Sequence, residues 1–176
     1  MHGHARTCLH PDTNAMNDTN HLVVFSLDDM QFGLRLSSVE RVARAVEITK
    51  LPKAPPTVIG IVNIQGRIVP VVNLRKRFGL PEKPITLHDH ILVGKTSSRS
   101  VAFVVDNVID IMESSRKDIV LQEDILEGME CFEGVAKLND GMLLIHDLER
   151  LLSSDEERSL DAALARAAGQ KGTPKK

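Results

Sequence analysis

Four aspartates stand where paired carboxylates could transfer protons: Asp28, Asp29, Asp106 and Asp110. General acid–base catalysis needs such groups within hydrogen-bonding distance of one substrate. Each of these aspartates, however, falls at a predicted hairpin turn or strand end, where Asp is favoured because its side chain bonds nearby backbone amides. Turn formation explains them better than catalysis does, so we expect no enzymatic activity.

Two groups of residues could in principle bind a metal ion, one near the start of the chain and one in its middle. They are His2, His4 and His10, and His88 with Asp89 and His90. Neither has the spacing of a closed tetrahedral site. The chain also contains no nucleophile elbow, phosphate-binding glycine loop, His-Glu-x-x-His motif or Cys-x-x-Cys pair. We therefore expect no metal and no cofactor, and we interpret both histidine groups as solvated segments.

A local basic strip consists of Arg67, Arg75, Lys76 and Arg77 and could contact an RNA strand. Single-strand binders, however, stack bases on exposed aromatic rings, and this chain has 3% aromatic residues with no Trp and no Tyr. Its 22 basic and 24 acidic residues give a net charge of −2, so no overall field attracts nucleic acid or an anionic membrane. We expect no nucleic-acid partner. Binding that falls steeply with salt would favour that alternative instead.

The ends of the chain differ from its middle. Residues 1–20 lack both periodicity and an apolar signal region, and residues 169–176 are similar, so we expect a disordered leader and tail. No run approaches the roughly 18 apolar residues that span a bilayer, which predicts no membrane insertion. Cys8 and Cys131 are too far apart in sequence to suggest a disulfide framework and indicate a reducing, cytoplasmic setting.

Residues 21–168 consist of short runs rich in Val and Ile separated by turn residues, a pattern typical of antiparallel β-structure. The runs predict four hairpins: 22–27 with 30–36, 58–64 with 67–72, 91–95 with 101–105, and 135–138 with 142–145. Gly66 supplies the turn of the second hairpin because glycine adopts positive φ freely. Pro70 should confine its strand to an edge or a bulge, since it lacks an amide donor.

Other segments are less regular. A serine cap and apolar residues three apart predict a brief helix over residues 37–42, and residues 45–51 look like a further strand. Leucines and alanines from 148 to 167 recur at helical spacing, with Ser154 and Glu157 placed as a capping box. Together these elements predict an all-β fold of two small barrels side by side, divided near residues 81–89, with a groove between them that suits a partner.

One segment is unusually specific. Residues 51–80 combine a proline-rich turn, the run Gly60-Ile61-Val62-Asn63-Ile64-Gln65-Gly66, and the run Pro70-Val71-Val72-Asn73-Leu74-Arg75 followed by Phe78-Gly79. This segment resembles the signature of the CheW family of chemotaxis coupling proteins. The similarity continues over about residues 22–152, through runs such as Val23-Val24-Phe25 and Val104-Val105-Asp106-Asn107-Val108.

The resemblance implies two intertwined five-stranded SH3-like barrels with no catalytic activity. It also implies two protein partners: the regulatory domain of a CheA-type histidine kinase, and the hairpin tip of a methyl-accepting chemotaxis receptor, which would lie in the groove as a helix. The expected location is the cytoplasm, at receptor arrays beneath the inner membrane. An interaction module of a pilus or another non-flagellar chemosensory pathway would use the same fold and remains an alternative.

Carried over by position, the resemblance also implies contact residues. For the receptor they are Val39, Arg41, Gly60, Asn63, Gln65 and Ile111, and for the kinase they are Arg67 and Arg75. Gln65 stands where the family usually has arginine, Arg41 where some members carry an acidic residue, and Asn73 where aspartate is usual. Because the fixed charge at position 65 is lost, we hypothesise that partner choice differs from that of a generic member, and that Arg41 compensates.

Overall fold

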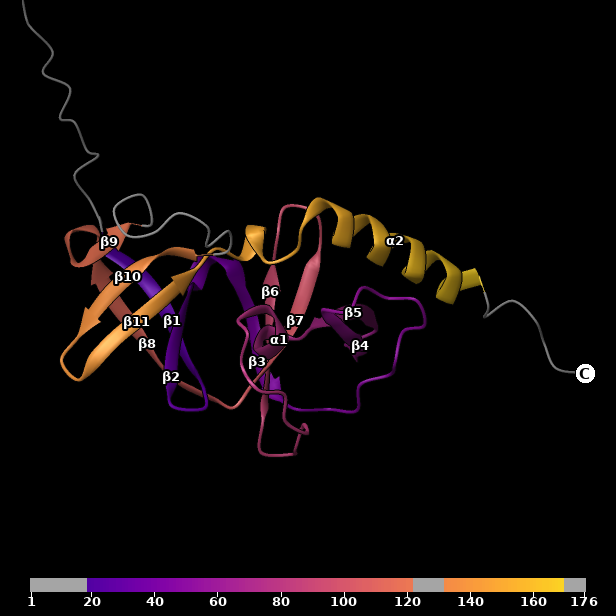
Figure 1. Ribbon diagram of the computed structural model, residues 1–176, viewed down its shortest axis with the longest axis horizontal. Helices are drawn as coiled ribbons and strands as arrows, with labels where there is room; N and C mark the ends of the chain where they lie inside the picture. The colour runs from indigo at the N-terminus through magenta and orange to yellow at the C-terminus, as the bar shows by residue number, and fades with distance from the viewer. Residues whose placement is uncertain (1–18, 122–131, 170–176) are drawn as a thin grey trace, which may run out of the picture.

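The computed structural model describes residues 19–121 and 132–169, which form two β-sheets lying side by side (Figure 1). The six-stranded sheet has the order β8-β1-β2-β11-β10-β9, and the five-stranded sheet has the order β3-β6-β7-β5-β4. The strands of the six-stranded sheet are β1 (Thr19–Leu27), β2 (Met30–Arg35), β8 (Asn107–Ser115), β9 (Ile119–Leu121), β10 (Phe132–Leu138) and β11 (Gly141–His146). Those of the five-stranded sheet are β3 (Val39–Arg44), β4 (Val58–Ile64), β5 (Arg67–Val72), β6 (His90–Lys95) and β7 (Ser100–Val105).

The all-β prediction is confirmed, and all four predicted hairpins are present as β1–β2, β4–β5, β6–β7 and β10–β11. The predicted division near residues 81–89 is wrong. That segment connects β5 to β6 within the five-stranded sheet, whereas the β1–β2 hairpin pairs with β8 and β11 from the second half of the chain. The two sheets are therefore intertwined, and one of them has six strands rather than five.

The two sheets share one strand topology. Strands β8, β1, β2, β11 and β10 occupy the same order as β3, β6, β7, β5 and β4, and each set contains one parallel pair, β2–β11 or β7–β5. The two corresponding hairpins, β4–β5 and β10–β11, each shift register next to a buried glycine, Gly60 or Gly134. A Cβ at Gly60 would lie 2.2 Å from the Thr49 carbonyl oxygen, and one at Gly134 would lie 2.6 Å from the Val120 carbonyl oxygen. Both positions thus need glycine for the close approach of another backbone segment.

Two local predictions between β2 and β4 are wrong. Only Leu36–Ser38 is helical, as one 3₁₀ turn, and β3 begins directly afterwards. A register shift between Val39 and Arg41 breaks the strict alternation that identifies a strand, which explains the helix-like spacing. The expected strand over 45–51 is reduced to one isolated bridge, between Thr49 and Ile61.

Pro70 was expected to confine its strand to a sheet edge or a bulge. Strand β5, which contains Pro70, instead lies inside its sheet, between β7 and β4. Its pairing with β7, however, runs through Val71 and Val72 and leaves Pro70 out. The missing amide donor therefore interrupts no pairing with β7.

One apolar core is shared by both sheets. Phe25 and Phe32 from the six-stranded sheet pack with Val72, Leu92 and Phe103 from the five-stranded sheet. Four of the five phenylalanines are buried, and the fifth, Phe78, packs against this core. Burial of this apolar surface provides the main driving force that holds the sheets together.

The C-terminal helix α2 (Ser154–Gly169) lies against the five-stranded sheet (Figure 1). Its Leu160 and Ala163 pack on Leu51 and Val58. The predicted capping box is displaced by one residue: the Ser153 hydroxyl accepts from the Glu156 amide at 3.2 Å, and the Glu156 carboxylate accepts from the Ser153 amide at 2.8 Å. None of the helices in the described residues is long and apolar enough to cross a membrane.

The expected leader and tail overlap the folded part slightly, because β1 begins at Thr19 and α2 ends at Gly169. The remainder of the leader and of the tail, together with Cys8 and Cys131, lies outside the described residues.

Candidate protein interface

The turn between β4 and β5 presents two of the predicted receptor contacts. Gln65 and Gly66 both have positive φ, 50° and 83°, as in the two-residue hairpin turns that match strand twist. The Asn63 side-chain oxygen accepts a hydrogen bond from the Gly66 amide at 2.8 Å and fixes this turn. Asn63 therefore holds the turn through its side-chain oxygen, and Gln65 is exposed at the tip of the hairpin.

An ion pair connects this hairpin to β3. Arg67 Nη2 lies 3.3 Å from Glu40 Oε2, and the Ser100 hydroxyl donates to the same oxygen at 3.0 Å. Glu40 lies between Val39 and Arg41 at the start of β3, so the pair brings the turn close to two more predicted receptor contacts. The Arg67 side chain is 61% exposed, and such a surface pair contributes only about 0–1 kcal/mol. The pair therefore matters for the charge it places at this surface rather than for stability.

Two predicted receptor residues lie elsewhere. Gly60 is buried beneath Thr49, so the close approach that it permits is made by this chain and not by a partner. Ile111 belongs to β8 in the other sheet, opposite Val23 of β1, and is 53% exposed. It lies on an edge strand of the six-stranded sheet, where its side chain can contact a partner.

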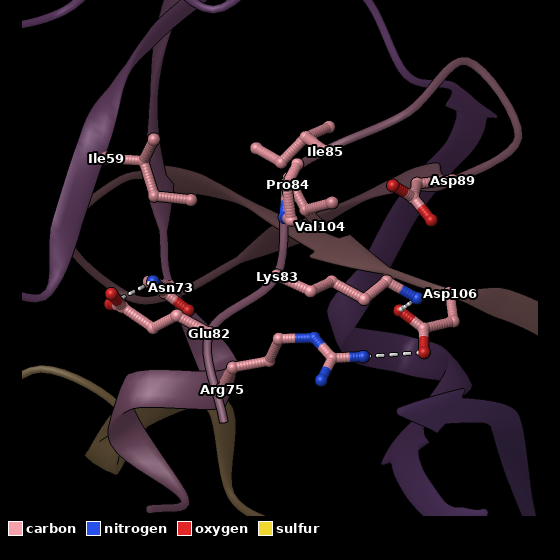
Figure 2. Close-up of a pocket in the computed structure, with 10 residues that line it drawn as sticks. All are labelled: Ile59, Asn73, Arg75, Glu82, Lys83, Pro84, Ile85, Asp89, Val104 and Asp106. Carbon is pink, nitrogen blue, oxygen red and sulfur yellow. Dashed lines mark hydrogen bonds and ion pairs between the residues drawn. The ribbon is translucent and has the colours of Figure 1, made fainter. Parts of the chain in front are cut away.

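Arg75, predicted to contact a kinase, has its guanidinium inside the molecule. It lies in helix α1 (Leu74–Arg77), directly after β5, and is 8% exposed. Its two terminal nitrogens bond both oxygens of Asp28 at 2.7 and 3.0 Å, and one of them also bonds Asp106 at 2.6 Å. Figure 2 shows Arg75 with Asp106 and Lys83, whose ammonium lies 3.0 Å from the second Asp106 oxygen. In this arrangement the Arg75 guanidinium is not available to a partner.

The charges in this cluster stabilise one another. The hydrogen bonds between Arg75 and Asp28 lower the pKa of the Asp28 carboxyl and raise the pKa of the Arg75 guanidinium. Burial tends to raise the pKa of Asp106, but hydrogen bonds from Arg75, the Asp28 amide and Lys83 outweigh it and lower the pKa. Asp28, Asp106 and Arg75 thus remain charged over the physiological pH range.

A cavity of about 290 Å³ opens beside the cluster, lined on one side by Ile59, Ile85 and Val104 (Figure 2). Its polar lining is internally paired: Asn73 donates to Glu82 at 3.2 Å, and buried Asp89 accepts from the Thr86 amide at 2.6 Å. These polar groups of the lining therefore have hydrogen-bond partners within the protein.

This cluster was not predicted from the sequence, because Asp28 and Asp106 were both expected to act as turn residues. Both do stand at turns, yet their carboxylates bond Arg75 from distant parts of the chain. The signal in the sequence was Arg75 itself, which follows the apolar residues Val71, Val72 and Leu74 closely. An arginine held so close to the core needs acidic partners.

Comparison with known proteins places this geometry in a family. The CheW-like domain matches residues 21–156, which include strands β2 to β11 and all of β1 except its first two residues. Chemotaxis protein CheW of Rhizobium meliloti (strain 1021) is 28% identical over 145 residues, which cover 81% of this chain and 94% of the relative. Chemotaxis protein CheW of Treponema pallidum (strain Nichols) is 28% identical over 153 residues, covering 83% and 90%.

A solved structure is similar in fold as well as in sequence. The crystal structure of scaffolding protein TtCheW from Thermoanaerobacter tengcongensis superposes with a TM-score of 0.71 at 30% identity and covers 78% of this chain and 94% of that protein. This similarity supports the assignment of both sheets as SH3-like barrels. From the family match and the shared fold together, the chain belongs to the CheW-like family.

Proposed function

We propose that this chain is a non-catalytic adaptor that couples methyl-accepting chemotaxis receptors to a CheA-type histidine kinase, at receptor arrays beneath the inner membrane. The observation that carries the proposal is the family match over both sheets, 21–156. The adaptor would work by binding both partners at once, so that a change in the receptor reaches the kinase through one rigid body. Avidity in an array allows each interface to be weak.

The receptor surface that we propose combines the start of β3, the β4–β5 turn and the exposed face of β8. Val39 and Ile111 would provide apolar contacts, and Arg41 and Gln65 would orient the receptor helix by hydrogen bonds and charge. Gly60 would act indirectly, by allowing the 45–51 segment to pack on β4.

The proposed kinase contact at Arg67 lies beside this receptor surface, because Arg67 pairs with Glu40 next to Val39 and Arg41. Because Glu40 pairs with Arg67, that cation is balanced within the chain. The charge missing at Gln65 would instead come from Arg41, which is exposed at the start of β3.

Co-sedimentation with receptor-tip fragments and CheA tests the proposal. Ile111→Glu should remove receptor binding and leave kinase binding intact, because it places a charge in an apolar contact. Val120→Glu is the matched control: Val120 is 50% exposed and lies on β9, at the opposite edge of the same sheet. If wild type sediments with neither partner, or if both variants behave alike, the proposed adaptor role or its surface is wrong.

Partner choice is tested by Gln65→Arg, which restores the charge usual in the family. We expect it to change the ratio of affinities for different receptor tips. Asn139→Arg adds the same charge to the corresponding turn between β10 and β11 and should leave that ratio unchanged. An unchanged ratio in Gln65→Arg would show that position 65 does not select the partner.

A further inference from the structure

The topology shared by the two sheets extends to the residues that follow the corresponding strands β5 and β11. After β5 come Asn73, Leu74 and Arg75, and after β11 come Asp147, Leu148 and Glu149. In each case the first side chain caps a short helical turn, Asn73 accepting from the Lys76 amide and Asp147 from the Glu149 amide. In each case the leucine is buried in the core that the sheets share. The third residues, Arg75 and Glu149, then occupy equivalent places.

Each of these third residues contacts the opposite sheet. Arg75 follows the five-stranded sheet and holds Asp28, in the β1–β2 turn of the six-stranded sheet. Glu149 follows the six-stranded sheet and holds Ser97, in the β6–β7 turn of the five-stranded sheet. Strands β1 and β2 correspond to β6 and β7 in the shared topology, so the two contacts are equivalent and reciprocal.

Both contacts use two atoms on each side. The Arg75 fork meets both oxygens of Asp28 at 2.7 and 3.0 Å. The two Glu149 oxygens accept from the Ser97 amide at 2.7 Å and from its hydroxyl at 2.9 Å. A two-point charged hydrogen bond fixes direction as well as distance. The shared apolar core lacks this property, because hydrophobic attraction is non-directional.

We propose that Arg75 and Glu149 are positioning residues that act as reciprocal clamps and set the orientation of the two sheets relative to one another. Asp106 strengthens the first clamp from the β7–β8 junction, where the chain passes from one sheet to the other. The apolar core holds the sheets together, and the clamps select one orientation among those that the core permits.

The test measures orientation directly. Spin labels at Lys95→Cys in β6 and Lys137→Cys in β10, both exposed, report the distance between the sheets in a chain that also carries C8S and C131S. Double electron–electron resonance should give a narrow distance distribution for this parent. We expect E149A and R75K to widen or shift the distribution while the protein remains folded by circular dichroism. Glu149 is exposed and Lys keeps the charge of Arg75, so neither change leaves an unpaired buried charge.

Arg77→Gln is the matched control. Arg77 lies in the same short helix, but its partner Glu156 belongs to α2, which packs on the five-stranded sheet that precedes α1. R77Q should therefore lower the melting temperature without changing the distance between labels. Unchanged distributions in both E149A and R75K would overturn the proposal. Equal widening in R77Q would also overturn it, because general loosening would then explain the effect.

The consequence for signalling rests on the proposed function. If the clamps keep two partner surfaces in one orientation, E149A should reduce the mutual enhancement of receptor and kinase binding more than it reduces either affinity alone. A chain that binds neither partner but shows the expected distance changes would refute the adaptor role and leave the clamps intact. If the chain binds both partners but E149A and R75K leave the distances between labels unchanged, the adaptor role stands and the clamps are refuted.

Discussion

His146 should make this protein sensitive to mild acid. Its side chain, in a residue that is 7% exposed, lies among Phe32, Phe78 and Phe132, with ring centroids 5.6, 4.2 and 5.9 Å away. Burial disfavours the charged imidazolium and lowers the pKa of His146 to about 4, against an ordinary value of 6.5. A contact of 3.3 Å between Nδ1 and the Leu144 carbonyl oxygen opposes this effect only weakly.

The sign and size of the effect follow from linkage. The folded pKa lies below the unfolded one, so the unfolded chain takes up the proton first as the pH falls. The free energy of unfolding is therefore unaffected by His146 above pH 6.5, decreases between pH 6.5 and 4, and levels off below that. A pKa difference of about 2.5 corresponds to roughly 3 kcal/mol over the full window. That is a large part of the roughly 5–15 kcal/mol by which a typical domain is stable.

Urea unfolding of wild type and His146→Leu at pH 7.5 and 4.5 measures this contribution. Circular dichroism is the appropriate signal, because the chain has no Trp and no Tyr. Wild type should lose about 2–3 kcal/mol more than the variant between these two pH values. Asp28, Asp106 and Glu156 are present in both proteins, so their contributions cancel in the comparison. Equal losses in the two proteins would show that His146 is not held neutral by burial.

Three further substitutions test the packing and turn arguments. Gly60→Ala should destabilise by about 1–3 kcal/mol in urea unfolding, because its Cβ would meet the Thr49 carbonyl oxygen; a stability equal to wild type would mean that the 45–51 segment is free to move. Ser153→Ala should cost about 1 kcal/mol and speed amide exchange in the first turn of α2, since Glu156 loses its capping partner; unchanged exchange would contradict the cap. Gly66→Ala, with open space around it but φ of +83°, should cost about 1–2 kcal/mol from backbone strain alone, and a neutral result would indicate that the turn relaxes.

Much of the local structure followed from the sequence. Alternation of apolar residues and strong turn signals located all four hairpins, because these depend on neighbouring residues and on backbone preferences. The signature around Gly60 to Arg75 identified the family, which the match over residues 21–156 confirms. The receptor contacts and the kinase contact at Arg67 carried over from that resemblance stay predictions, whereas the Arg75 guanidinium is held by Asp28 and Asp106.

Elements with weaker local signals were predicted less well. The bulge between Val39 and Arg41 gave β3 an apolar spacing that looked helical. The α2 cap lies one residue earlier than expected because two adjacent serines, Ser153 and Ser154, stand at the start of the helix. The fold decides which of them caps by orienting Glu156, which also bonds Thr57 and Arg77.

Short-range periodicity and one contiguous motif were enough to locate the four hairpins with their turns and to identify the family. Which strands share a sheet depended on tertiary contacts, since the pairing of β1 with β8 joins residues that are 81 to 96 positions apart in the sequence. The roles of Arg75 and Glu149 also depended on those contacts. Their partners, Asp28 and Ser97, are ordinary turn residues in sequence and become clamps only when the intertwined sheets bring each turn to the end of the other sheet.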